Sequence, residues 1–152
     1  MSLYPTLERV SPHLFWDELA CHDETRTPYP VEWRRDRAVV LAEEFEALRA
    51  LGGGLPLLVA SGFRTPAWNR FVRGALHSQH IEGRALDLMP VAPLTVMELY
   101  RLARARAKTS GSALRGLGLY KHWVHIDTRP ASQLVAWAGP GVADTRGMAR
   151  DT

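Results

Sequence analysis

Two short segments of the chain carry histidines together with well-placed carboxylates. The first contains His80 and Asp87, and the second contains His122, His125 and Asp127. Zinc in proteins is bound by histidine nitrogens and carboxylate oxygens, and a catalytic zinc site uses three such ligands while a fourth position takes water. His80, Asp87 and His125 would supply a set of this kind. On residue types alone this is a hypothesis, because buried polar side chains also serve as hydrogen-bonding members of a core.

Polar and apolar residues alternate within the two segments, which predicts that Asp87 and His125 lie on equivalent faces of two strands. Successive side chains of a strand point to opposite faces of the sheet. Asp87 stands between two leucines, and His125 stands between a valine and an isoleucine. These apolar neighbours would anchor the reverse face, so the carboxylate and the imidazole could face each other across paired strands. Gly83 permits the turn that brings His80 back toward Asp87.

The same segments resemble the peptidase M15 family. Residues 78–87, SQHIEGRALD, match the SxHxxGxAxD motif of that family at every fixed position. Residues 123–127, WVHID, look like its second metal segment, and residues 61–66, SGFRTP, are similar to its SGYR element. The three segments occur in family order. The family includes zinc D-Ala-D-Ala carboxypeptidases, vancomycin-resistance D-Ala-D-Ala dipeptidases and phage L-alanyl-D-glutamate endolysins.

The resemblance implies hydrolysis of a peptide bond by metal-activated water, with the stem peptides of bacterial peptidoglycan as partner. The reaction would be that of a D-Ala-D-Ala carboxypeptidase or of an L,D- or D,D-endopeptidase. One Zn²⁺ would be the cofactor, and His80, Asp87 and His125 would be its ligands. The alternative is a non-catalytic, zinc-containing module of the same fold that binds the cell wall.

Roles for other polar side chains also follow from the resemblance. Arg64 matches a family arginine near the reacting carbonyl or the substrate carboxylate, and its planar fork suits either. Ser78 would bind substrate or brace its loop. Many members place Asp or Glu three residues before the last ligand; this chain has His122 there, in the turn before that strand, and a neutral imidazole can accept a proton from water. Glu82 and Asp127 are the other candidate bases, and Asp127 could instead orient a ligand imidazole.

Hydrophobic periodicity and turn residues predict an α+β fold, in which several helices pack against a small antiparallel sheet with the zinc site on one sheet face. Phe15, Glu18 and the Pro28–Pro30 segment resemble the M15 subgroup of short single domains. We expect one domain over residues 1–139 and a flexible tail over 140–152. The expected helices span 38–51, 66–74 and 94–107, and the expected strands span 57–60, 84–89, 117–120 and 123–128.

Composition agrees with an ordinary globular domain. The chain has 152 residues, 46% of them hydrophobic, and a net charge of +3. The basic residues are scattered, and no recognition helix or finger spacing is present, so we expect no nucleic-acid partner. Cys21 is the single cysteine, which excludes an intrachain disulfide. No apolar run reaches the length of a membrane span or a signal peptide. We expect a monomer, and the sequence leaves the cellular location open.

Overall fold

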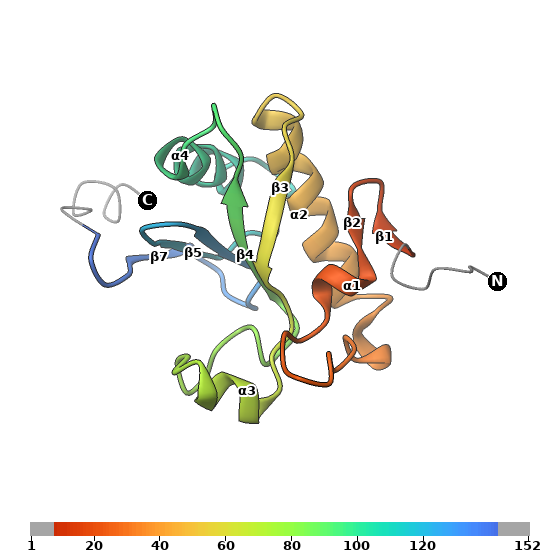
Figure 1. Cartoon of the computed structure of the whole chain (residues 1–152). Helices are drawn as coiled ribbons and strands as arrows, with labels where there is room; N and C mark the ends of the chain where they lie inside the picture. Colours follow the sequence, from red (N-terminus) through yellow and green to blue (C-terminus); the bar gives the residue numbers. More distant parts are fainter. Residues whose placement is uncertain (1–7, 143–152) are drawn as a thin grey trace.

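The computed structural model describes residues 8–142 and has an α+β architecture (Figure 1). Two sheets, four α-helices and a short 3₁₀ helix make up the described part of the chain. The elements in chain order are β1 (Arg9–Ser11), β2 (Leu14–Phe15), α1 (Trp16–Leu19), η2 (Val31–Trp33), α2 (Arg37–Leu51), β3 (Leu57–Ser61), α3 (Pro66–Phe71), β4 (Ala85–Pro90), α4 (Val96–Ala107), β5 (Gly116–Leu119), β6 (Val124–Asp127) and β7 (Val135–Ala138).

The helices begin and end where local chemistry dictates. The Asp36 side chain accepts a hydrogen bond at the start of α2, and Thr95 does the same for α4. Such side chains satisfy backbone N–H groups that have no partner inside the helix. The α2 helix ends at Gly52, and Gly53 then takes a positive φ of 86°. Both long helices lie within two residues of their predicted ranges, while α3 ends at Phe71, earlier than the predicted 74.

The main sheet has five strands in the order β3-β4-β6-β5-β7. All neighbours are antiparallel except β5 and β7, which pair in parallel. The sheet is therefore mixed, where the sequence predicted an antiparallel one. The reason is β7, a four-residue strand that was not predicted. It returns to the sheet edge beside β5 by a crossing connection, and no hairpin signal in the sequence marks such a pairing.

One face of the central strands forms the hydrophobic core. Helix α4 packs against β4, β5 and β6, and α2 packs against α4 and the β1–β2 hairpin. The strand side chains on this face are fully or almost fully buried: Leu86, Leu88, Leu117, Leu119, Val124 and Ile126. Burying one such side chain contributes roughly 1.5–3 kcal/mol. The alternate residues of the same strands therefore point away from α4, toward the side of the sheet where α3 and its following loop lie (Figure 1).

Two sets of hydrogen bonds tie the N-terminal region to the rest of the fold. Glu46 of α2 accepts hydrogen bonds from Ser11 Oγ at 2.7 Å and from the His13 backbone at 2.9 Å, which ties the hairpin to the helix. Tyr29 Oη donates to the Gly83 carbonyl at 2.6 Å. This second bond links the N-terminal segment to the loop before β4, which carries a candidate metal ligand.

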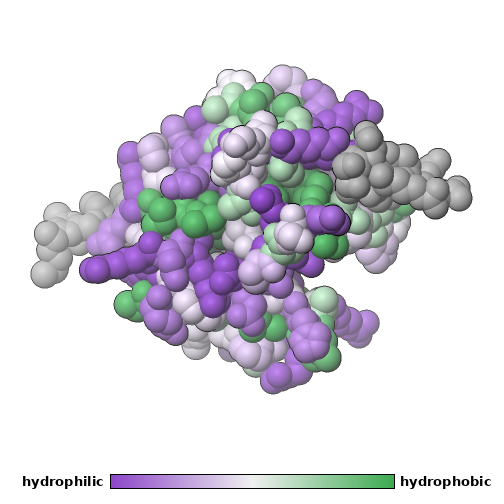
Figure 2. Space-filling view, turned by 180° about the vertical axis from the view of Figure 1, so that it is seen from behind, coloured by the Kyte–Doolittle hydropathy of each residue, from purple (hydrophilic) through white to green (hydrophobic). Residues whose placement is uncertain are grey.

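The remaining surface is mixed in character. Figure 2 shows the face opposite to Figure 1 as largely hydrophilic with separate, small hydrophobic groups. None of the helices in residues 8–142 combines the length and apolarity that a membrane crossing needs. At the C-terminal end, Val142 still packs against the core. Most of the predicted tail, residues 143–152, lies outside the described residues.

Candidate metal centre and its pocket

The site is built on one row of residues that crosses the main sheet. Ser61 pairs with Asp87, Asp87 with His125, His125 with Gly118, and Gly118 with Trp137. Residues opposite each other in a ladder point to the same face. The strand register therefore places Asp87 and His125 opposite each other on the same face, as the alternation of residues predicted. Their side chains are buried, with 7% and 9% exposure.

His80 reaches the same point from the loop between α3 and β4. Its backbone carbonyl accepts from Arg64 N at 3.0 Å, and its Nδ1 lies 2.7 Å from the Gly62 carbonyl oxygen. Gly83, at a φ of 65°, then turns the chain into β4. A Cβ at Gly83 would collide with Trp33 and Tyr29, so the turn needs glycine for space as well as conformation. This is the turn that the sequence predicted.

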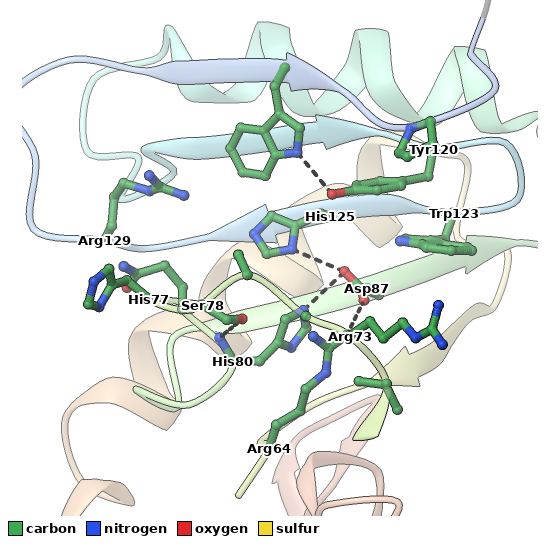
Figure 3. A pocket seen from close by; sticks show the side chains of 16 residues that line it. Arg64, Arg73, His77, Ser78, His80, Asp87, Tyr120, Trp123, His125 and Arg129 are labelled. Carbon is green, nitrogen blue, oxygen red and sulfur yellow. Dashed lines mark hydrogen bonds and ion pairs between the residues drawn. The ribbon is translucent and has the colours of Figure 1, made fainter. Parts of the chain in front are cut away.

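The donor atoms of His80, Asp87 and His125 converge on one point. Asp87 Oδ1 lies 3.2 Å from His80 Nε2 and 3.1 Å from His125 Nδ1, and all three ligand atoms lie within 4.8 Å of one another (Figure 3). A zinc ion with ligand bonds of about 2.0–2.2 Å fits between atoms at this spacing. The structure therefore brings together the three side chains that the sequence singled out.

The hydrogen bonds around His80 show that the site presents acceptor atoms to a cation. The Gly62 carbonyl only accepts, so His80 Nδ1 carries the proton and Nε2 keeps its lone pair. That Nε2 atom is buried without a hydrogen-bond partner. Burial lowers the pKa of His80, which keeps the ring neutral. Two acceptors, Nε2 and Asp87 Oδ1, thus face each other, and a cation between them satisfies both.

His125 is oriented from behind by Asp127. Its Nε2 lies 2.8 Å from Asp127 Oδ2, which directs Nδ1 toward Asp87. Burial lowers the pKa of His125, but hydrogen bonds with Asp127 and Asp87 outweigh it and leave the pKa raised. Metal binding would displace the proton from Nδ1, because a ligating imidazole is neutral. Asp127 itself is fully buried and receives two bonds from the Arg129 guanidinium, at 2.9 and 2.7 Å.

Asp87 stays ionised in this setting. Burial raises its pKa, but the two neighbouring imidazoles, His80 and His125, outweigh burial and hold the pKa well below its usual range. Arg64 adds a third partner, since its Nη2 donates to Asp87 Oδ2 at 3.2 Å. Arg64 Nε also donates to Ser61 Oγ at 3.1 Å. The predicted arginine therefore lies directly beside the predicted ligands, with its guanidinium at the pocket.

Ser78 and His122, the other predicted site residues, differ in where they lie. Ser78 lines the pocket and is buried, and its Oγ accepts from the His80 backbone N–H at 3.2 Å. His122 is exposed and occupies the two-residue tip of the β5–β6 hairpin, which a Tyr120 N to Trp123 O hydrogen bond closes. It lies in the turn, as expected, but is not among the residues that line the pocket. Glu82 lies elsewhere and pairs with Arg37.

An open pocket of about 520 Å³ lies over these groups. Tyr120, Trp123 and Trp137 form an aromatic wall, with the rings of Tyr120 and Trp123 stacked at 4.9 Å between centroids. Trp137 Nε1 donates to Tyr120 Oη at 3.0 Å. The sequence did not single out Tyr120. Its position just before the hairpin tip was the available signal.

Two glycines on β5 make room for this wall. A Cβ at Gly116 would collide with the Asp127 carboxylate, and one at Gly118 would approach the Trp137 ring to 2.7 Å. Between them, the leucines of β5 point into the core. The alternation of glycine and leucine thus leaves one face of β5 without side chains. The Asp127 carboxylate and the Trp137 ring lie against this face.

Two buried imidazoles and one carboxylate at the base of an open pocket define the class: an α+β protein with a group of side chains that could hold one metal ion. The family model for peptidase M15 matches residues 12–127, and the chain belongs to the peptidase M15 family. This family consists of zinc-dependent peptidases, which agrees with the His-Asp-His group. A search of curated proteins finds no match to the chain.

Proposed function

We propose that the protein is a zinc-dependent peptidase that cleaves the stem peptides of peptidoglycan, as a carboxypeptidase or as an endopeptidase. The observation that carries the proposal is the convergence of His80, Asp87 and His125 within 4.8 Å at the base of a pocket, in a chain of the M15 family. Zinc, when bound, supplies Lewis acidity that polarises a carbonyl and makes water a nucleophile near neutral pH.

The chain's own side chains would bind and orient the peptide. Arg64 offers its guanidinium beside Asp87 to a carbonyl or carboxylate oxygen of the substrate. Tyr120 offers a proton: the Trp137 indole only donates, so Tyr120 Oη accepts from it and keeps its own hydrogen for another acceptor. Figure 3 shows this hydroxyl directed toward the space over His125 and Asp87, where a donor would stabilise charge that develops on a carbonyl oxygen. Ser78 would add a contact from the loop.

His122 is our proposed proton acceptor, on the strength of its position three residues before His125. Its ring is exposed and outside the pocket, so this role requires the hairpin tip to fold toward the pocket when the peptide binds. Catalytic contacts often tighten only in the substrate complex. Asp127 is less suited to the role of base, because His125 and Arg129 already occupy its oxygens.

Zinc analysis and digestion of purified sacculi test the proposal together. The wild-type protein should hold about one zinc, and mass spectrometry of the digest should show new peptide termini that name the bond. Asp87→Asn is the matched control, since it removes a ligand charge without changing shape. It should lose both zinc and cleavage. A protein that holds no metal under zinc-replete conditions would contradict the proposal.

A second candidate is a zinc-containing module that binds the wall without cutting it. The exposed position of His122 favours it, since a centre that lacks a proton acceptor would hold metal but hydrolyse slowly. The same experiment separates the two. Zinc together with sacculus binding, but with no released fragments, would identify the binding module.

A further inference from the structure

Arg73 holds a backbone conformation that normally belongs to glycine. It follows α3 at a φ of 58°. Gly74 N donates to Asn69 O at 2.8 Å and Arg73 N to Arg70 O at 3.1 Å, which is the pattern of a Schellman motif. In this motif the residue with positive φ is usually glycine, and an L-residue there costs roughly 1–2 kcal/mol. The chain places glycine one position later and an arginine at the strained position.

Arg26 is the other non-glycine residue with positive φ in residues 8–142, and it shows a different pattern. Its guanidinium donates to the Asp17 carbonyl at 3.1 Å and pairs with the Asp17 carboxylate at 3.2 Å. Those contacts offset its strain within the fold. The Arg73 side chain has no hydrogen-bond or ion-pair partner in the described part of the chain. Persistent strain without a local contact points to a role outside the folded chain.

The position of Arg73 indicates what that role is. Its side chain lines the pocket of the metal centre, and Figure 3 shows it on the opposite side of Asp87 from Arg129. Three arginines line this pocket. Arg64 is paired with Asp87 and Arg129 with Asp127, so Arg73 is the one whose charge no carboxylate of the pocket offsets.

We infer that Arg73 is a specificity-determining residue that binds a carboxylate of the substrate on the Trp123 side of the metal centre. The inference rests on the proposed peptidase function and adds to it a second anionic contact, separate from that of Arg64. A guanidinium binds a carboxylate through two parallel hydrogen bonds, which fixes orientation as well as charge. Stem peptides carry such groups at the D-glutamyl unit and at the C-terminus.

Kinetics with matched peptides test the inference. The probes are a synthetic stem pentapeptide, the same peptide with its D-glutamyl carboxylate amidated, and the same peptide with a C-terminal amide. Arg73→Gly should lower kcat/KM about tenfold on the free peptide, mainly through KM. It should have no effect on kcat/KM for the amidated peptide that lacks the carboxylate bound by Arg73. Arg73→Lys should recover part of the loss. Arg73→Gly should also melt at the same or a higher temperature than wild type, because glycine relieves the strain.

Arg26→Gly is the matched control, because it changes the same residue type at the same backbone conformation, with the side chain held by Asp17. It should leave KM unchanged for all three peptides. An equal loss by Arg73→Gly on every peptide, or no loss on any, would overturn the inference. Failure of the wild type to cut any peptide would instead contradict the proposed function. Calorimetric titration with the pentapeptide then decides about Arg73, since equal affinity of wild type and Arg73→Gly would exclude the contact.

Discussion

His80 and His125 present different ring nitrogens to the same carboxylate. The Gly62 carbonyl holds the proton of His80 on Nδ1 and leaves Nε2 for a metal, whereas Asp127 holds the proton of His125 on Nε2 and leaves Nδ1. The partner behind each ring therefore selects the ligand atom. Motif spacing predicted which three side chains meet. It did not predict the nitrogen of His80, because that choice depends on a contact with Gly62, which lies 18 residues earlier in the chain.

Tyr120 shows where prediction from residues stopped. A tyrosine before a turn has no distinctive spacing, and its importance depends on Trp137, which reaches it through the unpredicted strand β7. Arg73 was missed for a related reason: a positive φ at an arginine cannot be read from residue type. His122 was predicted from the motif alone, and its role as base stays a prediction.

Replacing Tyr120 by phenylalanine tests its proposed hydroxyl contact. The variant should lose about a hundredfold in kcat, the scale for one donor to a developing oxyanion, with a smaller change in KM. Zinc content should not change. Stability should fall by only about 1 kcal/mol, because the Trp137 indole loses one acceptor. A wild-type kcat in Tyr120→Phe would remove this residue from the mechanism.

His122→Ala tests the proposed proton acceptor. We expect zinc content equal to wild type and a loss of at least about a hundredfold in rate. Lys121→Ala, at the other position of the hairpin tip, is the control and should retain full activity. Loss of zinc in His122→Ala would mean that the ligand set is misassigned, and an unchanged rate would show that another group takes the proton.

At the scale of elements, the sheet supplies two of the candidate ligands and the loop before β4 supplies the third. Four strands and the two long helices were predicted close to their observed limits, because their apolar alternation and caps are local. The β1–β2 hairpin, α1, η2 and β7 were not predicted. These elements are only two to four residues long, too short for periodicity to register, and β7 depends on a parallel partner distant in sequence.

Strand β5 offers a direct test of how an element supports the site. In Gly116→Ala the added methyl group meets the Asp127 carboxylate, which must then move away from His125. We expect a loss of about 1–3 kcal/mol in stability and about 10–100-fold in zinc affinity. Gly111→Ala is the control, because its φ is 87° but its Cβ would meet open space. It should cost stability alone, and unchanged zinc affinity in Gly116→Ala would contradict this account.

On the scale of the whole molecule, the site joins parts that the hydrophobic core does not. Helix α4 packs against β4, β5 and β6 on the core face, which is opposite to the metal centre. The loop that carries His80 is instead held by Tyr29 from the N-terminal segment and by the 62–64 segment. A metal ion would add a bond between this loop and the sheet.

Chelation should therefore affect the molecule unevenly. Removing zinc should lower the melting temperature, since a ligand at a hundred times its Kd stabilises the native state by about 2.7 kcal/mol. Hydrogen exchange should rise mainly in residues 74–84 and little in β4 or β6. A uniform rise across the sheet would show instead that the ion supports the whole fold.

The hydrogen bond from Arg64 N to the His80 carbonyl has a further consequence. Arg64 is joined to one ligand through its backbone and to another, Asp87, through its guanidinium. If the centre holds zinc, a peptide that engages this arginine would act on the coordination sphere, and the two occupancies would be thermodynamically linked. Because such linkage is reciprocal, the factor by which a bound peptide changes zinc affinity equals the factor by which zinc changes peptide affinity.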